Sequence, residues 1–163
     1  RRDRSVVVSR SAGRSRDGYR DEGMDVEVAA DELRIDGSPV DGAASVAASL
    51  GPPDRTITTE RTVAGLDDRS PLTVDIWDTR GVMAGDSWVA IAVGANVLDE
   101  GAWPEGRLEG RVLIDGQDLS QAPLTFDPLH GDRRNAEVGR WQVTLVVDWD
   151  GSPGKLVVRR RDA

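Results

Sequence analysis

The chain has 163 residues, 38% of them hydrophobic, which is enough for one packed core. No apolar run approaches the roughly 20 residues of a membrane-spanning helix, and the lack of cysteine excludes disulfides and thiolate metal sites. The formal net charge of −8 repels phosphate backbones, so nucleic-acid binding by the folded part is not expected.

The first 23 residues differ in composition from the rest of the chain. They hold seven Arg against four acidic residues, a net charge of +3, whereas the remainder carries −11. Arg, Ser, Gly and Asp dominate, a composition typical of disorder. Three interpretations are open: a reading frame extended upstream of Met24, a flexible basic tail, or a targeting signal, which the short apolar run at residues 6–8 disfavours. We predict a basic leader at residues 1–23 and one folded domain at 24–163.

The folded part begins with short strand patterns. Residues 26–28 and 33–35 alternate between apolar and polar side chains. Asp36-Gly37 then predicts a hairpin turn, because both residue types accept positive φ. The return arm contains Pro39, which favours an edge position in a sheet because proline lacks an amide donor.

The helix pattern that follows covers residues 42–50. Asp41 precedes it and is the expected cap of its first amides. Its apolar residues recur at helical spacing, and Gly51 followed by two prolines predicts its end. A helix of barely three turns is unstable alone, so we expect it to pack on a sheet.

Strand patterns occupy the rest of the chain. Residues 55–63 are Thr-rich, residues 72–77 alternate, and residues 88–93 are apolar enough for a central strand. Together with the short helix, these segments predict an α+β fold: a mostly antiparallel β-sheet with one short helix packed on it.

The last third of the chain repeats the strand-and-turn pattern. Residues 108–114 lead to a second Asp-Gly turn at 115–116, and residues 141–149 form a long strand that returns through residues 156–160. Prolines interrupt residues 121–137, which we expect to be a loop. Residues 34–40 resemble 113–119, either by duplication of a half-domain or, as we favour, by independent use of the same hairpin chemistry.

Four segments resemble a bacterial family of unknown function. Residues 33–39 match its I-x-G-x-P hairpin, residues 50–55 its L-G-x-P helix end, residues 76–82 its I-W-D-x-x-G-I strand, and residues 108–116 its second hairpin. Val82 stands where that family has Ile. The resemblance covers roughly residues 30–120. It implies a small α+β domain and supplies no activity, cofactor or catalytic residue.

Few residues suit catalysis. His130 is the sole histidine, so a multi-histidine zinc site is not possible. A general base or metal ligand oriented by Asp127 or Asp132 is the alternative, and a solvated loop position is the expected role. Asp75 and Asp78 flank Trp77, but they point to opposite faces of a strand and Asp78 suits a turn. Asp148 and Asp150 suggest a calcium loop only faintly, and a hairpin tip is the preferred interpretation.

Tryptophan accounts for five of the seven aromatic residues. Trp77 and Trp88 come from neighbouring strands and are expected to pack in the core, where they could meet as a cross-strand pair. The alternative is an aromatic surface for a partner protein or a sugar, with Trp103, Trp77 and Trp88 as binding residues. Trp103 is the best candidate, because it lies in a loop before a proline.

We expect a non-catalytic, cytoplasmic protein-interaction module whose acidic surface faces a basic protein partner, as in immunity proteins. The first alternative is a small-ligand or carbohydrate binder that uses the tryptophans, which requires a concave apolar pocket. The second is a hydrolase that uses Asp75, Asp78 and His130, which requires them to converge. No cofactor, metal or membrane contact is predicted.

Overall fold

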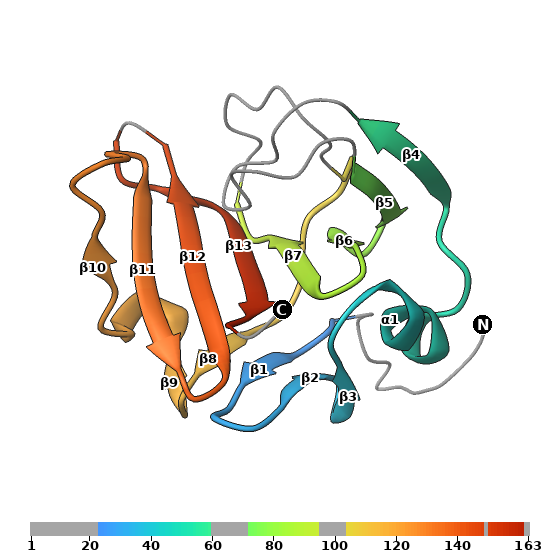
Figure 1. Cartoon of the computed structure of the whole chain (residues 1–163), viewed down its shortest axis with the longest axis horizontal. Coiled ribbons are helices and arrows are strands. Elements are labelled where there is room, and N and C mark those ends of the chain that lie inside the picture. The colour runs from blue at the N-terminus through green and yellow to red at the C-terminus, as the bar shows by residue number, and fades with distance from the viewer. Residues whose placement is uncertain (1–22, 60–71, 95–103, 149, 162–163) are drawn as a thin grey trace, which may run out of the picture.

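The computed structural model describes residues 23–59, 72–94, 104–148 and 150–161, and these form two β-sheets (Figure 1). The small sheet has the strand order β3-β2-β1-β8-β9 and the large sheet the order β10-β11-β12-β13-β7-β6-β5-β4. The small sheet contains β1 (Val26–Val28), β2 (Leu33–Ile35), β3 (Ser38–Val40), β8 (Val112–Ile114) and β9 (Gln117–Asp118). The large sheet contains β4 (Arg55–Thr59), β5 (Leu72–Trp77), β6 (Val82–Ala84), β7 (Trp88–Ala92), β10 (Thr125–Phe126), β11 (Arg133–Val138), β12 (Trp141–Val147) and β13 (Pro153–Arg160).

The predicted antiparallel pairing with a short helix is confirmed in outline, and the fold is mostly β. Among the described strands, β1 with β8 forms the one parallel pair. The prediction of a single sheet is wrong, because the strands are divided between two separate sheets. Alternation along a strand shows which side chains are buried, but it does not show which strand lies next to it. Pro39 lies on β3, at an edge of the small sheet, as predicted.

The order of elements repeats along the chain. After β1, the first half runs β2, β3, the helix α1 (Ala43–Leu50), and then β4 to β7. The second half runs β8, β9, the 3₁₀ turn η1 (Leu119–Gln121), and then β10 to β13. The large sheet is arranged symmetrically around its central pair β13 and β7, where Val157 lies opposite Ala90. Figure 1 shows β10–β12 on one side of this pair and β4–β6 on the other.

The two Asp-Gly turns have the same backbone conformation. Asp36 and Gly37 have φ angles of 49° and 83°, and Asp115 and Gly116 have 51° and 83°. Positive φ at both central residues is the type I′ geometry that fits the twist of a hairpin. The sequence similarity of the two hairpins therefore extends to a repeated arrangement of whole halves.

The main core lies between the two sheets. It collects buried side chains from β1, β2 and β8 of the small sheet and from the inner faces of β5 to β7 and β11 to β13. A second cluster of Val74, Ile76, Met83, Trp88, Ala90 and Val157 lies on the other face of the large sheet. Every residue of β7 is buried, which confirms the prediction of a central strand there.

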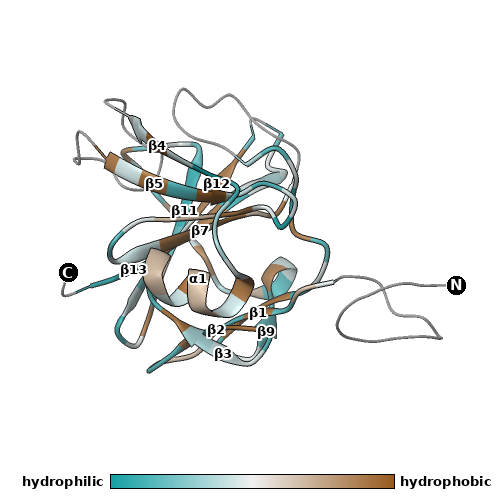
Figure 2. Cartoon of the chain, turned by 90° about the vertical axis from the view of Figure 1, so that its right-hand side faces the viewer, coloured by the Kyte–Doolittle hydropathy of each residue, from teal (hydrophilic) through white to brown (hydrophobic). Residues whose placement is uncertain are grey.

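The helix α1 lies between the small sheet and the first half of the large sheet (Figure 2), with β3 and β6 as neighbours. Its Val46 is fully buried, and it ends at Gly51, whose φ of 90° suits glycine. The predicted cap is wrong. The Ser45 hydroxyl accepts from the amides of Asp41 and Gly42, and the Asp41 carboxylate accepts from that hydroxyl.

Residues 121–137 were predicted to be a loop, and they contain β10 and most of β11. Their polar pattern hides the strands, because β11 is only partly buried over most of its length. The leader up to residue 22, Trp103 and Trp149 lie outside the described residues. Within the described part of the chain, no helix combines the length and the apolar character needed to span a bilayer.

Candidate ligand-binding cleft

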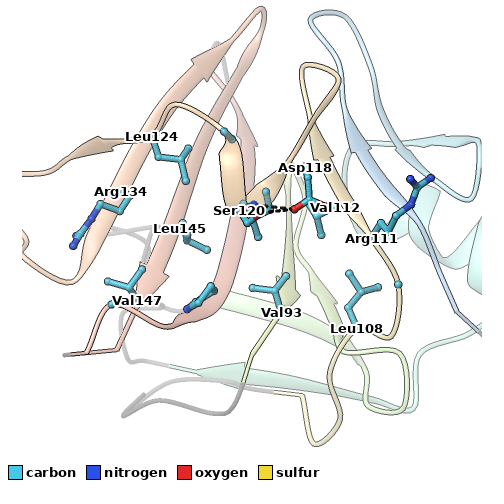
Figure 3. Close-up of a pocket in the computed structure, with 15 residues that line it drawn as sticks. Val93, Leu108, Arg111, Val112, Asp118, Ser120, Leu124, Arg134, Leu145 and Val147 are labelled. Carbon is cyan, nitrogen blue, oxygen red and sulfur yellow. Dashed lines mark hydrogen bonds between the residues drawn. The ribbon is translucent and has the colours of Figure 1, made fainter.

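A cleft of about 500 Å³ opens between the two sheets in the second half (Figure 3). Side chains from β8, β12 and the segments around β7 and η1 form its apolar lining. They include Val93, Leu108, Val112, Leu119, Ala122, Leu124, Leu145 and Val147. A cavity of this size, lined by both apolar and polar side chains, is within the range of ligand-binding sites and too large for a packing defect.

The single turn η1 closes one wall of the cleft. Asp118 caps it, since its carboxylate accepts from the Ser120 amide at 3.0 Å and from the Ser120 hydroxyl at 2.8 Å. These two hydrogen bonds, mainly the one from the Ser120 amide and then the one from its hydroxyl, hold the pKa of the Asp118 carboxyl below its usual value. The Asp118 carboxylate therefore stabilises the start of η1. This 3₁₀ turn is three residues long.

The register of the strands identifies the residue of the second half that corresponds to Trp77. In the first half Trp77 lies opposite Val82, and its indole Nε1 donates to the Gly51 carbonyl at the end of α1 over 2.9 Å. The corresponding position in the second half is Ala136, which lies opposite Val143. A methyl group replaces the indole, so the second half lacks both the volume and the hydrogen bond that fasten the helix end in the first.

Two arginines flank the cleft at opposite margins, with their charged ends directed outward in Figure 3. Arg111 is 66% exposed and lies 3.6 Å from an oxygen of Asp25. Arg134 donates through Nη1 to the carbonyls of Gly131 and Arg133. Within the described residues no carboxylate lies within ion-pair distance of Arg134, so its positive charge is not neutralised by a salt bridge.

Two large apolar side chains of the β10–β11 hairpin are exposed. Phe126 on the edge strand β10 is 55% exposed, and the Arg134 guanidinium lies 5.0 Å above its ring. Leu129, in the turn between β10 and β11, is 85% exposed. An arginine stacked on an exposed phenylalanine beside an apolar cleft is an arrangement that protein interfaces favour.

His130 lies in the exposed turn before β11, as predicted. Its Nδ1 is 3.3 Å from Oδ2 of Asp127. The amide of Leu129 is the main cause that lowers the pKa of the Asp127 carboxyl, with smaller contributions from Asn135 and His130. The Asn135 amide oxygen in turn accepts from the buried Thr144 hydroxyl at 2.9 Å. These bonds tie the turn to the sheet.

Asp75 and Asp78 do not converge with His130. Four strands lie between β5 and β11 in the large sheet. Asp75 accepts from the Thr56 hydroxyl at 2.7 Å. Asp78 accepts two bonds from Arg55, at 2.9 and 3.0 Å, and this pairing is the main cause that lowers the pKa of its carboxyl.

The predicted aromatic binding residues are not surface groups where the structure describes them. Trp77 is 3% exposed and Trp88 is 5% exposed. They belong to different clusters on opposite faces of the large sheet, so the predicted cross-strand pair does not form. Their burial agrees with the core role that we preferred from the sequence. Trp103 lies outside the described residues.

A smaller cleft of about 320 Å³ lies between the β2–β3 hairpin and Trp141. Its acidic lining is largely neutralised, because Glu32 pairs with Arg34 and Asp41 lies 3.6 Å from Arg160. Trp141 is 2% exposed, and its indole nitrogen has no hydrogen-bond partner in the structure. The paired charges make this cleft a weaker candidate than the one between the sheets.

Sequence reasoning missed the main cleft. Its lining comes from segments between residues 93 and 153 that no single motif joins. A usable signal was the second Asp-Gly hairpin, which lacks the helix that follows the first. Within the described residues no group of three His, Asp or Glu side chains is placed to hold a metal ion. No family model, curated protein or solved structure matches the chain, so the family resemblance stays a prediction.

Proposed function

We propose that this protein is a non-catalytic protein-interaction module and that the cleft between the sheets receives its partner. The observation that carries the proposal is the cleft between the sheets, which Arg134 lines, with the exposed Phe126 stacked against the Arg134 guanidinium. Large apolar side chains that are exposed together beside a concave surface favour association with another protein.

The roles of the acidic groups support binding rather than catalysis. Asp78 holds Arg55 and Asp118 caps a turn. At the β10–β11 turn, the Asp127 carboxylate accepts hydrogen bonds from the Leu129 amide and the Asn135 side chain, and it contacts the His130 ring. Lowered pKa values at these carboxyls follow from such structural bonds, whereas a general acid needs a raised pKa near the reaction.

The net negative charge of the chain favours long-range electrostatic attraction of a basic partner protein. The chain carries −8, and an acidic protein attracts basic proteins before contact. This is the charge logic of immunity proteins, which neutralise basic toxins. The lack of cysteine suits a reducing compartment such as the cytoplasm.

Site-specific photocrosslinking in the native host tests the proposal. A benzophenone amino acid at Leu124, which lines the cleft, is expected to form an adduct with one defined protein. The same group at the exposed Thr73, on β5 of the first half, is the matched control and should not form it. If Leu124 yields no protein adduct while a metabolite extract raises the melting temperature, the small-ligand alternative replaces this proposal.

A further inference from the structure

We propose that Arg134, stacked on Phe126, is the point at which the cleft recognises a carboxylate, and that an Asp or Glu of the partner supplies this group beside an apolar side chain. This inference rests on the proposed function, because it names the chemistry that holds the partner at the margin of the same cleft. It follows from the way the structure fixes the guanidinium of Arg134, and from the side chains at the equivalent place in the first half.

Backbone and ring contacts hold Arg134 in place without a carboxylate. Its Nη1 donates to the carbonyl of Gly131 at 3.0 Å and to that of Arg133 at 2.9 Å. The carbon at the centre of its guanidinium lies 5.0 Å from the centroid of the Phe126 ring. Among the residues that the structure describes, the N–H groups on its Nε and Nη2 have no acceptor. The guanidinium is therefore preorganised and keeps donors for a bound group.

The equivalent pair in the first half forms its own hydrogen bond. By the register that aligns β5 with β11, Asp75 corresponds to Arg134. Their cross-strand neighbours are Thr56 and Phe126, respectively. The Thr56 hydroxyl donates to the Asp75 carboxylate at 2.7 Å. The Phe126 ring attracts the guanidinium through its face but offers no lone pair to the N–H groups. The second half therefore presents charged donors where the first half closes a hydrogen bond.

The surroundings of Arg134 favour a carboxylate that is attached to an apolar group. A guanidinium can donate two parallel hydrogen bonds to a carboxylate, and such charged bonds are stronger than those between neutral groups. Phe126 is 55% exposed, and the half-buried Leu124 lines the same cleft as Arg134 (Figure 3). A bare inorganic anion would leave these apolar side chains uncovered, whereas an acidic residue next to an apolar one can cover them.

This local carboxylate is compatible with a partner that is basic overall. Long-range attraction depends on the net charge of each protein, whereas the contact at Arg134 depends on a single side chain of the partner. The chain carries −8 as a whole, and Arg134 is a positive group at the margin of its cleft. A basic protein with one acidic residue in its contact surface therefore meets both requirements.

Photocrosslinking from position 124 of the full chain supplies the protein for the test, and its Kd is then measured against variants of Arg134. Arg134→Met should weaken binding at least about tenfold, a loss that corresponds to 1.4 kcal/mol, because it removes the charged donors. Arg134→Lys keeps the charge without the two-pronged geometry and should lose less. Arg140→Met is the matched control. Arg140 also stacks on an aromatic ring, 5.5 Å from that of Trp141, but lies outside this cleft, so the Kd should not change.

An exchange of charges separates recognition from a general loss of structure. Mass spectrometry of the adduct identifies the partner's Asp or Glu nearest the crosslink. Arg134→Glu and the change of that partner residue to Arg should each weaken binding, and the two together should restore it. A Kd indifferent to Arg134→Met, or a charge exchange without restoration, would overturn the carboxylate site and leave the interaction function intact. Absence of any protein adduct from position 124 would remove the proposed function and this inference together.

Discussion

The two halves of the molecule share one order of elements and differ in how the space between the sheets is filled. In the first half, two turns of α1 bury Val46, and the Trp77 indole binds the carbonyl of Gly51 at the helix end. In the second half, η1 provides one turn and Ala136 stands at the position of Trp77. The cleft lies on this second side.

The comparison teaches that one repeated arrangement of strands can hold a packed helix in one half and border a cleft in the other. The hairpins, the strand order and the inward faces of the central strands agree between the halves, so these features serve stability. The differences include the helix and the side chains around it, the lengths of the edge strands, and an irregularity between Val146 and Val147.

The largest expected effect comes from removing the side chain that distinguishes the filled half. Trp77→Ala should lower the free energy of unfolding by about 3–5 kcal/mol, because it leaves a large cavity and removes the hydrogen bond to Gly51. Urea denaturation measures the loss. Trp77→Phe, which keeps most of the volume without the N–H donor, should cost clearly less. Equal losses for the two variants would show that packing of the indole contributes little.

Truncating one apolar side chain in each half compares how tightly the space between the sheets is packed in the two halves. Val46→Ala in α1 should cost about 2 kcal/mol, since two methyl groups leave a fully buried site. Leu124→Ala, in the lining of the cleft, should cost less than about 1 kcal/mol because its side chain is only half-buried. The same denaturation experiment serves both variants. A Leu124→Ala loss as large as that of Val46→Ala would mean that the cleft is packed as tightly as the first half.

Substitutions in the two Asp-Gly turns should lower the free energy of unfolding by the same amount in both halves. Gly37→Ala and Gly116→Ala should each cost about 1 kcal/mol, because both glycines have a φ of 83° and an alanine is strained there. Neither position has a neighbouring atom within 4 Å of the added methyl group, so the cost is conformational only. Thermal unfolding of the two variants should agree closely, and a large difference would contradict equivalent turns.

The smallest effect concerns the acid range. Since Arg55 lowers the folded-state pKa of Asp78, this carboxylate stabilises the fold above its unfolded pKa of about 3.9, and the contribution is lost as the pH falls through the lower folded value. Asp78→Asn should reduce stability at neutral pH by up to about 1 kcal/mol. It should also flatten the decline below pH 4. Melting curves between neutral pH and the acid transition measure this, and an unchanged decline would assign it to other carboxyls.

Prediction from the sequence succeeded where local chemistry decides. The Asp36-Gly37 turn, the stop at Gly51 and the edge position of Pro39 each follow from the backbone preferences of one or two residues. It failed at residues 121–137, because β11 alternates weakly, and at Asp41, because a nearby serine takes the capping role. Trp77 and Trp88 are buried, which agrees with the core role that the sequence favoured over their alternative role as binding residues. The sequence left both roles open, because a large apolar side chain can anchor either a core or a partner.

The sequence by itself determined the turns, the strand-rich character, the single α-helix and the acidic charge, because each depends on neighbouring residues or on composition alone. Only the tertiary structure decided that the strands divide between two sheets and that the second half repeats the first. It also placed Arg134 and the apolar side chains around one cleft. The physical reason is that strand pairing and cavity volume arise from contacts between residues far apart in the chain, which local propensity does not specify.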